Sequence, residues 1–165
     1  MKEKTCCFFG HKNMSVTEKL REKLYLEIED LIINNGVNTF LFCGKGCFDR
    51  LCLESVIKLK EKHPHIKRIY VRAEYPYIND WYERTLLKMY DETYYPERIM
   101  GAGKTVYVER NIEMIKRSMF CIVYYNEEEA PKKRKSGTKI AIEYATRYGI
   151  DIIYVGDMPC KHGAI

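Results

Sequence analysis

The sequence predicts an α/β fold with a mostly parallel sheet at its centre and helices on both faces. Three observations support this prediction. Short apolar runs alternate with longer amphipathic segments along most of the 165 residues. The apolar runs are continuous, as is typical of strands that are buried on both faces of a parallel sheet. Turn-forming residues follow most of these runs. Alternation of this kind implies right-handed crossovers between parallel strands.

Two strand–helix units open the chain. Residues 5–9 form the first predicted strand, and a helix capped by Thr17 follows it. This helix ends at Gly36, a residue type that favours the left-handed conformation after a helix. Residues 39–43 form the second strand, and the next helix spans about residues 48–62.

The remaining elements follow the same alternation within a single domain that spans residues 1–165. We expect further strands over residues 66–72, 97–100, 119–125 and 150–155. Three helices are predicted between them. The first begins at Asn79 or Asp80 and runs through Tyr90, the second spans about residues 106–116, and the third ends at Gly149. The core then covers about residues 5–155, and residues 156–165 form a peripheral tail.

Composition limits the class of protein. Lysine and arginine total 28 against 23 acidic residues, which gives a net charge of +5 and favours anionic ligands. No run approaches the ~18 apolar residues of a membrane span, and the N-terminus lacks a signal-peptide pattern. We therefore expect a cytoplasmic protein without membrane contact.

The seven cysteines do not indicate a disulfide framework, because their number is odd and no export signal precedes them. Cys43 and Cys47 flank a short turn, and Cys160 lies two residues before His162, but neither pair has the spacing of a four-ligand zinc site. We expect no metal site and no cofactor other than a nucleotide-like ligand.

Three turns supply the candidate binding residues, because each follows a predicted strand. The carboxyl ends of parallel strands meet at one edge of the sheet, where ligands bind. The turn before the last helix leaves backbone N–H groups for an anion, so we expect a phosphate there. Two residues of the predicted helix over 106–116 are added to those of the three turns. The candidates are Gly10, His11, Lys12, Gly44, Lys45, Gly46, Asp49, Arg110, Asn111, Ser136, Gly137 and Thr138.

Several of these residues have a second interpretation. His11 has either a hydrogen-bonding or phosphate-facing role or a structural role in the turn. Asp49 either holds a ribose hydroxyl or complements its helix dipole. Arg110 and Asn111 are either a solvated pair or contact the ligand or the neighbouring loop. The basic run 132–135 is a solvated loop or a cationic flap over the phosphate. Residues 101–105 lack the first glycine of a Walker A motif.

Four motifs occur in order along the chain. They are Phe9-Gly10-His11-Lys12, Gly44-x-Gly46-x-Phe48-Asp49, Tyr107-x-x-Arg110-Asn111 with Met114, and Ser136-Gly137-Thr138 before Tyr144-Ala145. Together they resemble the YpsA-like branch of the SLOG superfamily, which also includes the DprA DNA-processing proteins and the LOG phosphoribohydrolases. The resemblance covers about residues 5–155. It implies a Rossmann-like three-layer sandwich with a nucleotide site across the strand ends.

The chain departs from the family pattern at three positions. Lys12 replaces the usual arginine, which exchanges a bidentate contact for a point charge. Ser136 replaces a glycine, which requires a negative φ at that residue. Ala141 stands where the LOG enzymes have a glutamate, and Glu143 lies about 200° further around the helix. LOG-type hydrolysis is therefore disfavoured, and Asp49 is the candidate catalytic carboxylate.

The expected function is the binding or sensing of a nucleotide-derived small molecule. One alternative is an enzyme that hydrolyses the N-glycosidic bond of a nucleotide. Another is DprA-like binding of single-stranded DNA, which the net charge permits but which the scattered tyrosines do not favour. A homo-oligomer is compatible with a free-standing domain of this size.

Overall fold

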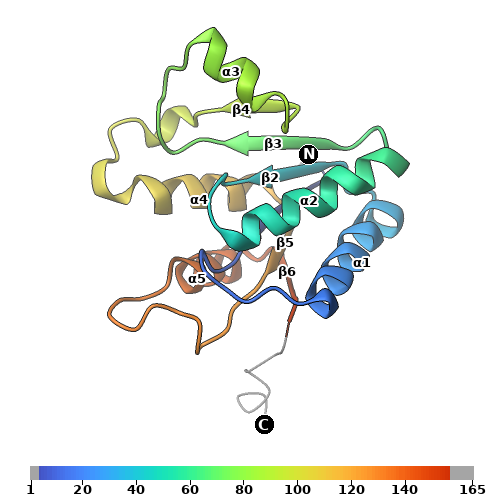
Figure 1. The fold of residues 1–165 in the computed structure, drawn as a ribbon. Helices are drawn as coiled ribbons and strands as arrows, with labels where there is room; N and C mark the ends of the chain where they lie inside the picture. Colours follow the sequence, from blue (N-terminus) through green and yellow to red (C-terminus); the bar gives the residue numbers. More distant parts are fainter. Residues whose placement is uncertain (1–3, 157–165) are drawn as a thin grey trace.

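Six parallel strands form one sheet in the order β4-β3-β2-β1-β5-β6 (Figure 1), which confirms the predicted α/β class. The computed structural model describes residues 4–156. β1 lies at the centre and pairs with β2 on one side and with β5 on the other. The strands are β1 (Thr5–Phe9), β2 (Thr39–Phe42), β3 (Lys67–Val71), β4 (Glu92–Tyr94), β5 (Phe120–Val123) and β6 (Asp151–Tyr154).

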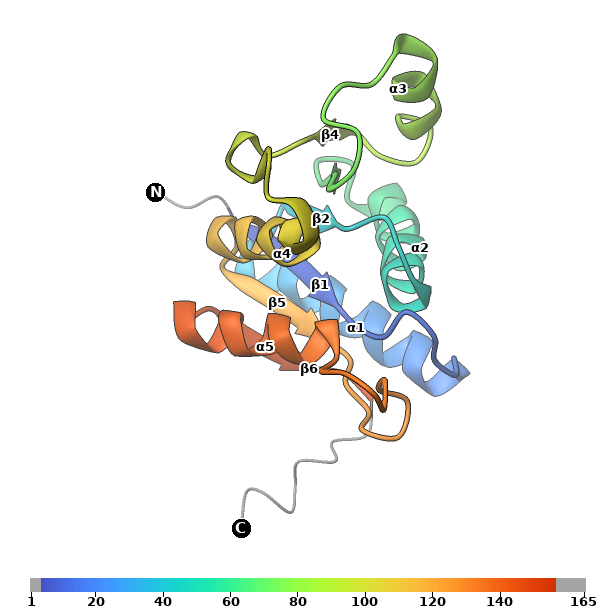
Figure 2. The ribbon, with the colours of Figure 1, turned by 90° about the vertical axis from the view of Figure 1, so that its left-hand side faces the viewer.

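Helices cover both faces of the sheet. Figure 2 shows α1 and α2 on one side of the strands and α4 and α5 on the other. The short α3 projects beyond β4 at the edge of the sheet, and none of its residues is buried. The helices are α1 (Glu18–Asn35), α2 (Cys47–Lys62), α3 (Asp80–Leu86), α4 (Val106–Arg117) and α5 (Gly137–Tyr148), with short 3-10 helices η1 (Glu97–Ile99) and η2 (Gly103–Thr105).

The central strand β1 contributes to two separate hydrophobic cores, because successive side chains point to opposite faces. Cys6 and Phe8 of β1 belong to the core beneath α1 and α2, where α1 buries Leu24. Cys7 and Phe9 belong to the core beneath α4 and α5. This explains why the apolar runs in the sequence are continuous rather than alternating.

The predicted helix boundaries are confirmed where a cap fixes them. The Thr17 hydroxyl accepts a hydrogen bond from the Leu20 N–H at 3.1 Å, and α1 ends before Gly36. Of the two alternatives for α3, Asn79 is the cap, since its side chain accepts from the Tyr82 N–H at 2.8 Å. This helix ends at Leu86, earlier than predicted.

The strand predicted over residues 97–100 is wrong, because that segment begins with η1 and the edge strand is β4. Arg68 of β3 fixes the position of β4. Its guanidinium forms two 3.0 Å hydrogen bonds to the carboxylate of Asp91, which directly precedes β4. Pro96 then ends the extended segment, since it has no N–H to continue the ladder.

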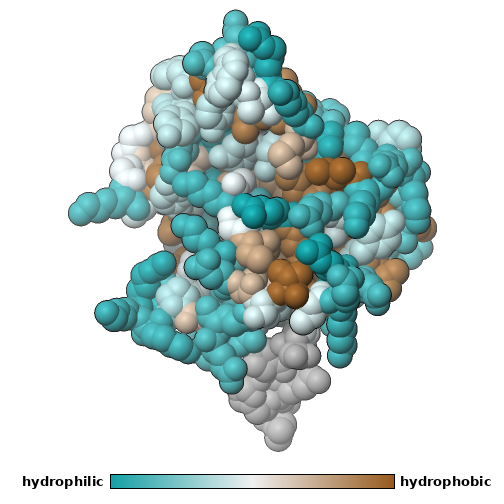
Figure 3. Space-filling model, viewed as in Figure 1, coloured by the Kyte–Doolittle hydropathy of each residue, from teal (hydrophilic) through white to brown (hydrophobic). Residues whose placement is uncertain are grey.

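Two further observations concern the surface and the ends of the chain. The face drawn in Figure 3 is mainly hydrophilic, with smaller hydrophobic patches near its middle. Within residues 4–156, no helix has both the length and the apolar character that a membrane span requires. The predicted tail over residues 156–165 lies, apart from Gly156, outside the described residues.

Candidate functional site

A cavity of about 330 Å³ opens at the carboxyl ends of the central strands. The strands that follow β1 in sequence, β2 to β4, lie on one side of it, and β5 and β6 lie on the other. The strand order therefore reverses direction at β1, and ligands of open parallel sheets bind at such a switch point. Of the twelve predicted residues, Gly44 and Gly46 do not line the cavity. The ten that do are Gly10, His11, Lys12, Lys45, Asp49, Arg110, Asn111, Ser136, Gly137 and Thr138.

His11 joins the loops that follow β1 and β5. The backbone of Asn126 reaches its Nε2 twice, through the N–H at 2.8 Å and the carbonyl oxygen at 3.0 Å, so this nitrogen accepts or donates according to the tautomer. Burial lowers the pKa of His11, which favours the neutral imidazole. The side chain therefore closes the crevice between the two strand ends by its hydrogen bonding to the Asn126 backbone.

The first turn of α2 is held by the loop after β1. The N–H groups of Cys47 and Phe48 donate to the carbonyls of Lys12 and His11, at 2.9 and 3.3 Å. Gly46 precedes them at a φ of 98°, and a side chain there would approach the Lys12 backbone. These donors are consequently unavailable to a ligand, and the turn serves to shape the cavity.

Asp49 holds the turn after β2. Its two carboxylate oxygens accept from the N–H groups of Cys43 and Gly44, both at 3.0 Å. The side chain is buried, and this burial raises the pKa of Asp49 above its usual value. Asp49 thus does more than complement a helix dipole, because it fixes the backbone that forms one wall of the cavity.

Arg110 is buried rather than solvated. Its Nη1 donates to the carbonyls of Val71 and Cys43, at 3.1 and 3.3 Å, and its Nε donates to Asn111 at 2.8 Å. The two carbonyls lie at the carboxyl ends of β3 and β2, so one guanidinium from α4 joins both strand ends. This position, at the edge of the cavity, leaves Arg110 beside any bound ligand.

The N-terminus of α5 presents unpaired donors to the cavity. Ser136 caps the helix, and its hydroxyl accepts from the Lys139 N–H at 3.1 Å. Its φ of −64° is the negative value that a serine requires at this position. Within residues 4–156, the N–H groups of Gly137 and Thr138 have no protein acceptor. They lie where the sequence predicts a phosphate.

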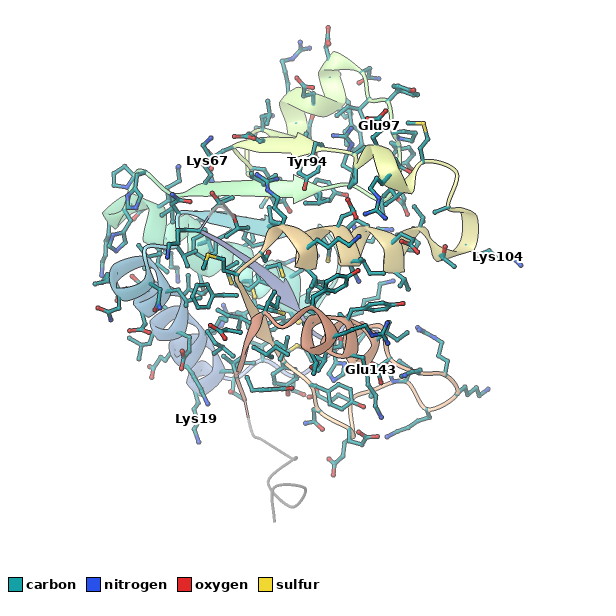
Figure 4. All side chains as sticks on the ribbon, turned by 180° about the vertical axis from the view of Figure 1, so that it is seen from behind. Lys19, Lys67, Tyr94, Glu97, Lys104 and Glu143 are labelled. Carbon is teal, nitrogen blue, oxygen red and sulfur yellow. The ribbon has the colours of Figure 1, made fainter. Side chains whose placement is uncertain are left out.

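The cations around the cavity differ in their pairing. Lys45 forms an ion pair of 2.6 Å with Glu74. Lys12 and Arg134 line the cavity and form no ion pair within residues 4–156. From the predicted flap, only Arg134 reaches the cavity, while Lys135 pairs with Glu143 at 2.6 Å on the outside of α5. Lys104 points outward, away from the cavity (Figure 4).

Sequence reasoning missed several residues of the site. Tyr107 and Arg134 carried a signal, since the first belongs to a quoted motif and the second to the basic run. Cys43 and Pro131 line the cavity without a distinguishing pattern. Glu74 had no signal either, because only the fold places it beside Lys45.

Nothing in the described part of the chain groups three or more histidine, cysteine, aspartate or glutamate side chains as a metal site would. Six cysteines lie in this part, and all are free. Cys160 and His162 lie outside the described residues.

The comparisons with known proteins support the fold. No family model matches the chain, and no curated protein matches it. Among solved structures, the crystal structure of TM1055, a structural genomics target, is similar with a TM-score of 0.51 at 12% identity. The match covers 90% of this chain and 72% of that one. A likeness at this identity concerns the fold alone, which is Rossmann-like.

Proposed function

We propose that this chain binds a nucleotide or nucleotide-derived ligand at the carboxyl ends of the strands and acts as a sensing or regulatory protein. The observation that carries the proposal is the start of α5, where the N–H groups of Gly137 and Thr138 have no acceptor among the described residues and border the cavity. A helix N-terminus with free N–H groups favours a phosphate. We assign the chain to the YpsA-like branch of the SLOG superfamily as part of this proposal.

The charge of the cavity supports an anionic ligand. Its lining contains the cationic side chains of Lys12, Arg110 and Arg134, together with Lys45, whose charge Glu74 balances. Among the described residues, Asp49 is the single carboxylate in this lining. Both oxygens of Asp49 already accept backbone N–H groups. The volume of about 330 Å³ is at the lower end of the range of small-molecule sites.

Binding without hydrolysis is favoured by the positions of the carboxylates. Ala141, which occupies the position of the LOG glutamate, is only 2% exposed and packs into the core beneath α4 and α5. Glu143 forms an ion pair with Lys135 on the surface of α5. An N-glycosidic hydrolase needs a carboxylic acid that protonates the leaving group, and Asp49 is committed to the turn after β2. Over residues 4–156, we observe no feature that favours single-stranded DNA over a small ligand.

The proposal is tested by native mass spectrometry of the purified protein for a co-purifying nucleotide, followed by calorimetric titration with AMP, ADP and ADP-ribose. We expect Gly137→Val to weaken binding by tenfold or more, on the order of 1.4 kcal/mol, because the new side chain covers the donors. The fold should tolerate it, since a Cβ at Gly137 meets no atom within 4 Å.

A matched pair of variants on α5 provides the control. Thr138→Ala removes a hydroxyl that borders the cavity and should weaken binding, whereas Thr146→Ala removes one that donates to the Ile142 carbonyl at the other end of the helix. Thr146→Ala should bind as the unsubstituted protein does. Unchanged affinity in both Gly137→Val and Thr138→Ala would contradict the assignment of the phosphate to this helix.

Asp49→Asn separates binding from hydrolysis. The amide places an NH₂ group against one of two backbone N–H donors, so we expect a loss of about 1–3 kcal/mol in the free energy of unfolding. Incubation with AMP, monitored by chromatography for released adenine, should show no turnover by the unsubstituted protein. Turnover that Asp49→Asn abolishes would favour the hydrolase instead.

A further inference from the structure

Three side chains from separate elements meet at the β2 and β3 side of the cavity. Lys45 follows β2, Glu74 follows β3, and Tyr107 lies in the first turn of α4. The Lys45 Nζ lies 2.6 Å from Glu74 Oε1 and 3.3 Å from the Tyr107 hydroxyl, which also contacts Glu74 Oε1. Lys45 and Tyr107 line the cavity, whereas Glu74 does not.

The contacts within this cluster leave one N–H donor on Lys45 and one lone pair on the Tyr107 hydroxyl, besides the unused acceptor sites of the Glu74 carboxylate. Glu74 is ionised, since the hydrogen bond from Lys45 lowers the pKa of Glu74, and a carboxylate accepts only. The Tyr107 hydroxyl therefore donates to Glu74 and accepts from Lys45, which leaves a lone pair. The ammonium of Lys45 has three N–H donors, of which these two contacts use two. A neighbouring donor and acceptor match a hydroxyl group, which has both functions.

The cluster is also unsuited to phosphate. Glu74 neutralises the charge of Lys45 across a short ion pair, while Lys12 and Arg134 elsewhere around the cavity have no such partner within residues 4–156. The strands β2 and β5 flank β1, so their ends lie about 10 Å apart at ~4.8 Å per strand. The cavity thus has an anionic-ligand end at α5 and a neutral, hydrogen-bonding end at Lys45 and Tyr107.

We infer that Lys45 and Tyr107 are the specificity-determining residues that bind a sugar hydroxyl of the ligand, and that Glu74 positions them. This inference rests on the proposed function and adds the orientation of the ligand. The phosphate lies at the start of α5, and the ribose hydroxyls face β2 and α4. Lys45, predicted from the sequence as a ligand-binding residue, acts here on the sugar.

The test compares AMP with 2′-deoxy-AMP and 3′-deoxy-AMP by calorimetry, with the corresponding diphosphates as probes if AMP does not bind. We expect the protein to bind at least one deoxy analogue about tenfold more weakly. Tyr107→Phe and Lys45→Met should reduce this preference to less than about twofold, because each removes one half of the donor–acceptor pair. Glu74→Gln should do the same, since the uncharged amide no longer orders the ammonium.

Two controls make the result specific. Gly137→Val should weaken the parent and deoxy nucleotides alike and leave their ratio unchanged. Glu92→Gln removes a similar surface ion pair, with Lys67 at 3.0 Å, and should keep the full preference. Equal binding of all three nucleotides, or a preference that survives in Tyr107→Phe and Lys45→Met, overturns the inference alone. Failure of every nucleotide to bind overturns the proposed function as well.

Discussion

Replacement of Gly10 by alanine should lower the free energy of unfolding by about 3 kcal/mol and the Tm by roughly 6–12 °C. A Cβ at this position would lie 2.3 Å from the ring of Phe48, which is far inside van der Waals contact. The ring has little room to move, because Phe48 is 1% exposed and stacks on Tyr124 with ring centroids 6.0 Å apart. Thermal and urea unfolding would measure the loss.

The same substitution at Gly137 is the control for this prediction. A Cβ at Gly137 meets nothing within 4 Å, so Gly137→Ala should leave stability within about 0.5 kcal/mol of the original. The double variant Gly10→Ala with Phe48→Leu should be more stable than the sum of the single effects predicts, since the smaller side chain relieves the clash. Strict additivity would show that the contact with Phe48 is not the cause.

Replacement of Arg110 by methionine should cost about 2–6 kcal/mol of stability, at about 1–3 kcal/mol for each of the two carbonyls that loses its donor. Methionine fills much of the same volume but leaves the carbonyls of Cys43 and Val71 without their shared donor. It also removes the cation that opposes the rise in the pKa of Asp49. Arg110→Lys should recover only part of the loss, because a single ammonium cannot reproduce a guanidinium that bonds two carbonyls and Asn111.

The effect of Arg110→Met should depend on pH in a defined direction. The pKa of Asp49 in the folded protein lies above its usual 3.8. The stability that this carboxyl group contributes is therefore fully present when the pH is below its pKa in the unfolded chain, and it is lost as the pH rises through its pKa in the folded protein. Without Arg110, this pKa rises further. The difference in stability between Arg110→Met and the original should therefore be smaller at pH 4 than at pH 7. A difference that is constant with pH would mean that Arg110 acts on the carbonyls alone.

Most of the fold could be predicted from the sequence because its signals are local. The continuous apolar runs of β1, β2 and β5 identify strands that both helical layers cover. The edge strand β4 was misplaced for the opposite reason. It is only three residues long, and Arg68, more than twenty residues earlier in the chain, fixes its position through Asp91. No periodicity in the sequence records a contact of that kind.

The candidate site could be predicted in part, because parallel strands bring the turns that follow them to one edge. Chain order alone therefore brought the turn at Gly10 and the turn at Gly137 into one cavity. It did not reveal which backbone donors are free. The α2 donors are occupied by the loop after β1, and the α5 donors are unpaired among the described residues.

By itself, the sequence determined the fold class, most elements, the positive charge and the turns that border the cavity, because these depend on local pattern and chain order. The tertiary structure decided what each polar group is paired with. It buried Arg110 against two strand ends, occupied both oxygens of Asp49, and placed Glu74 beside Lys45. The reason is physical, since hydrogen bonds and ion pairs between distant segments exist only once the sheet has brought those segments together.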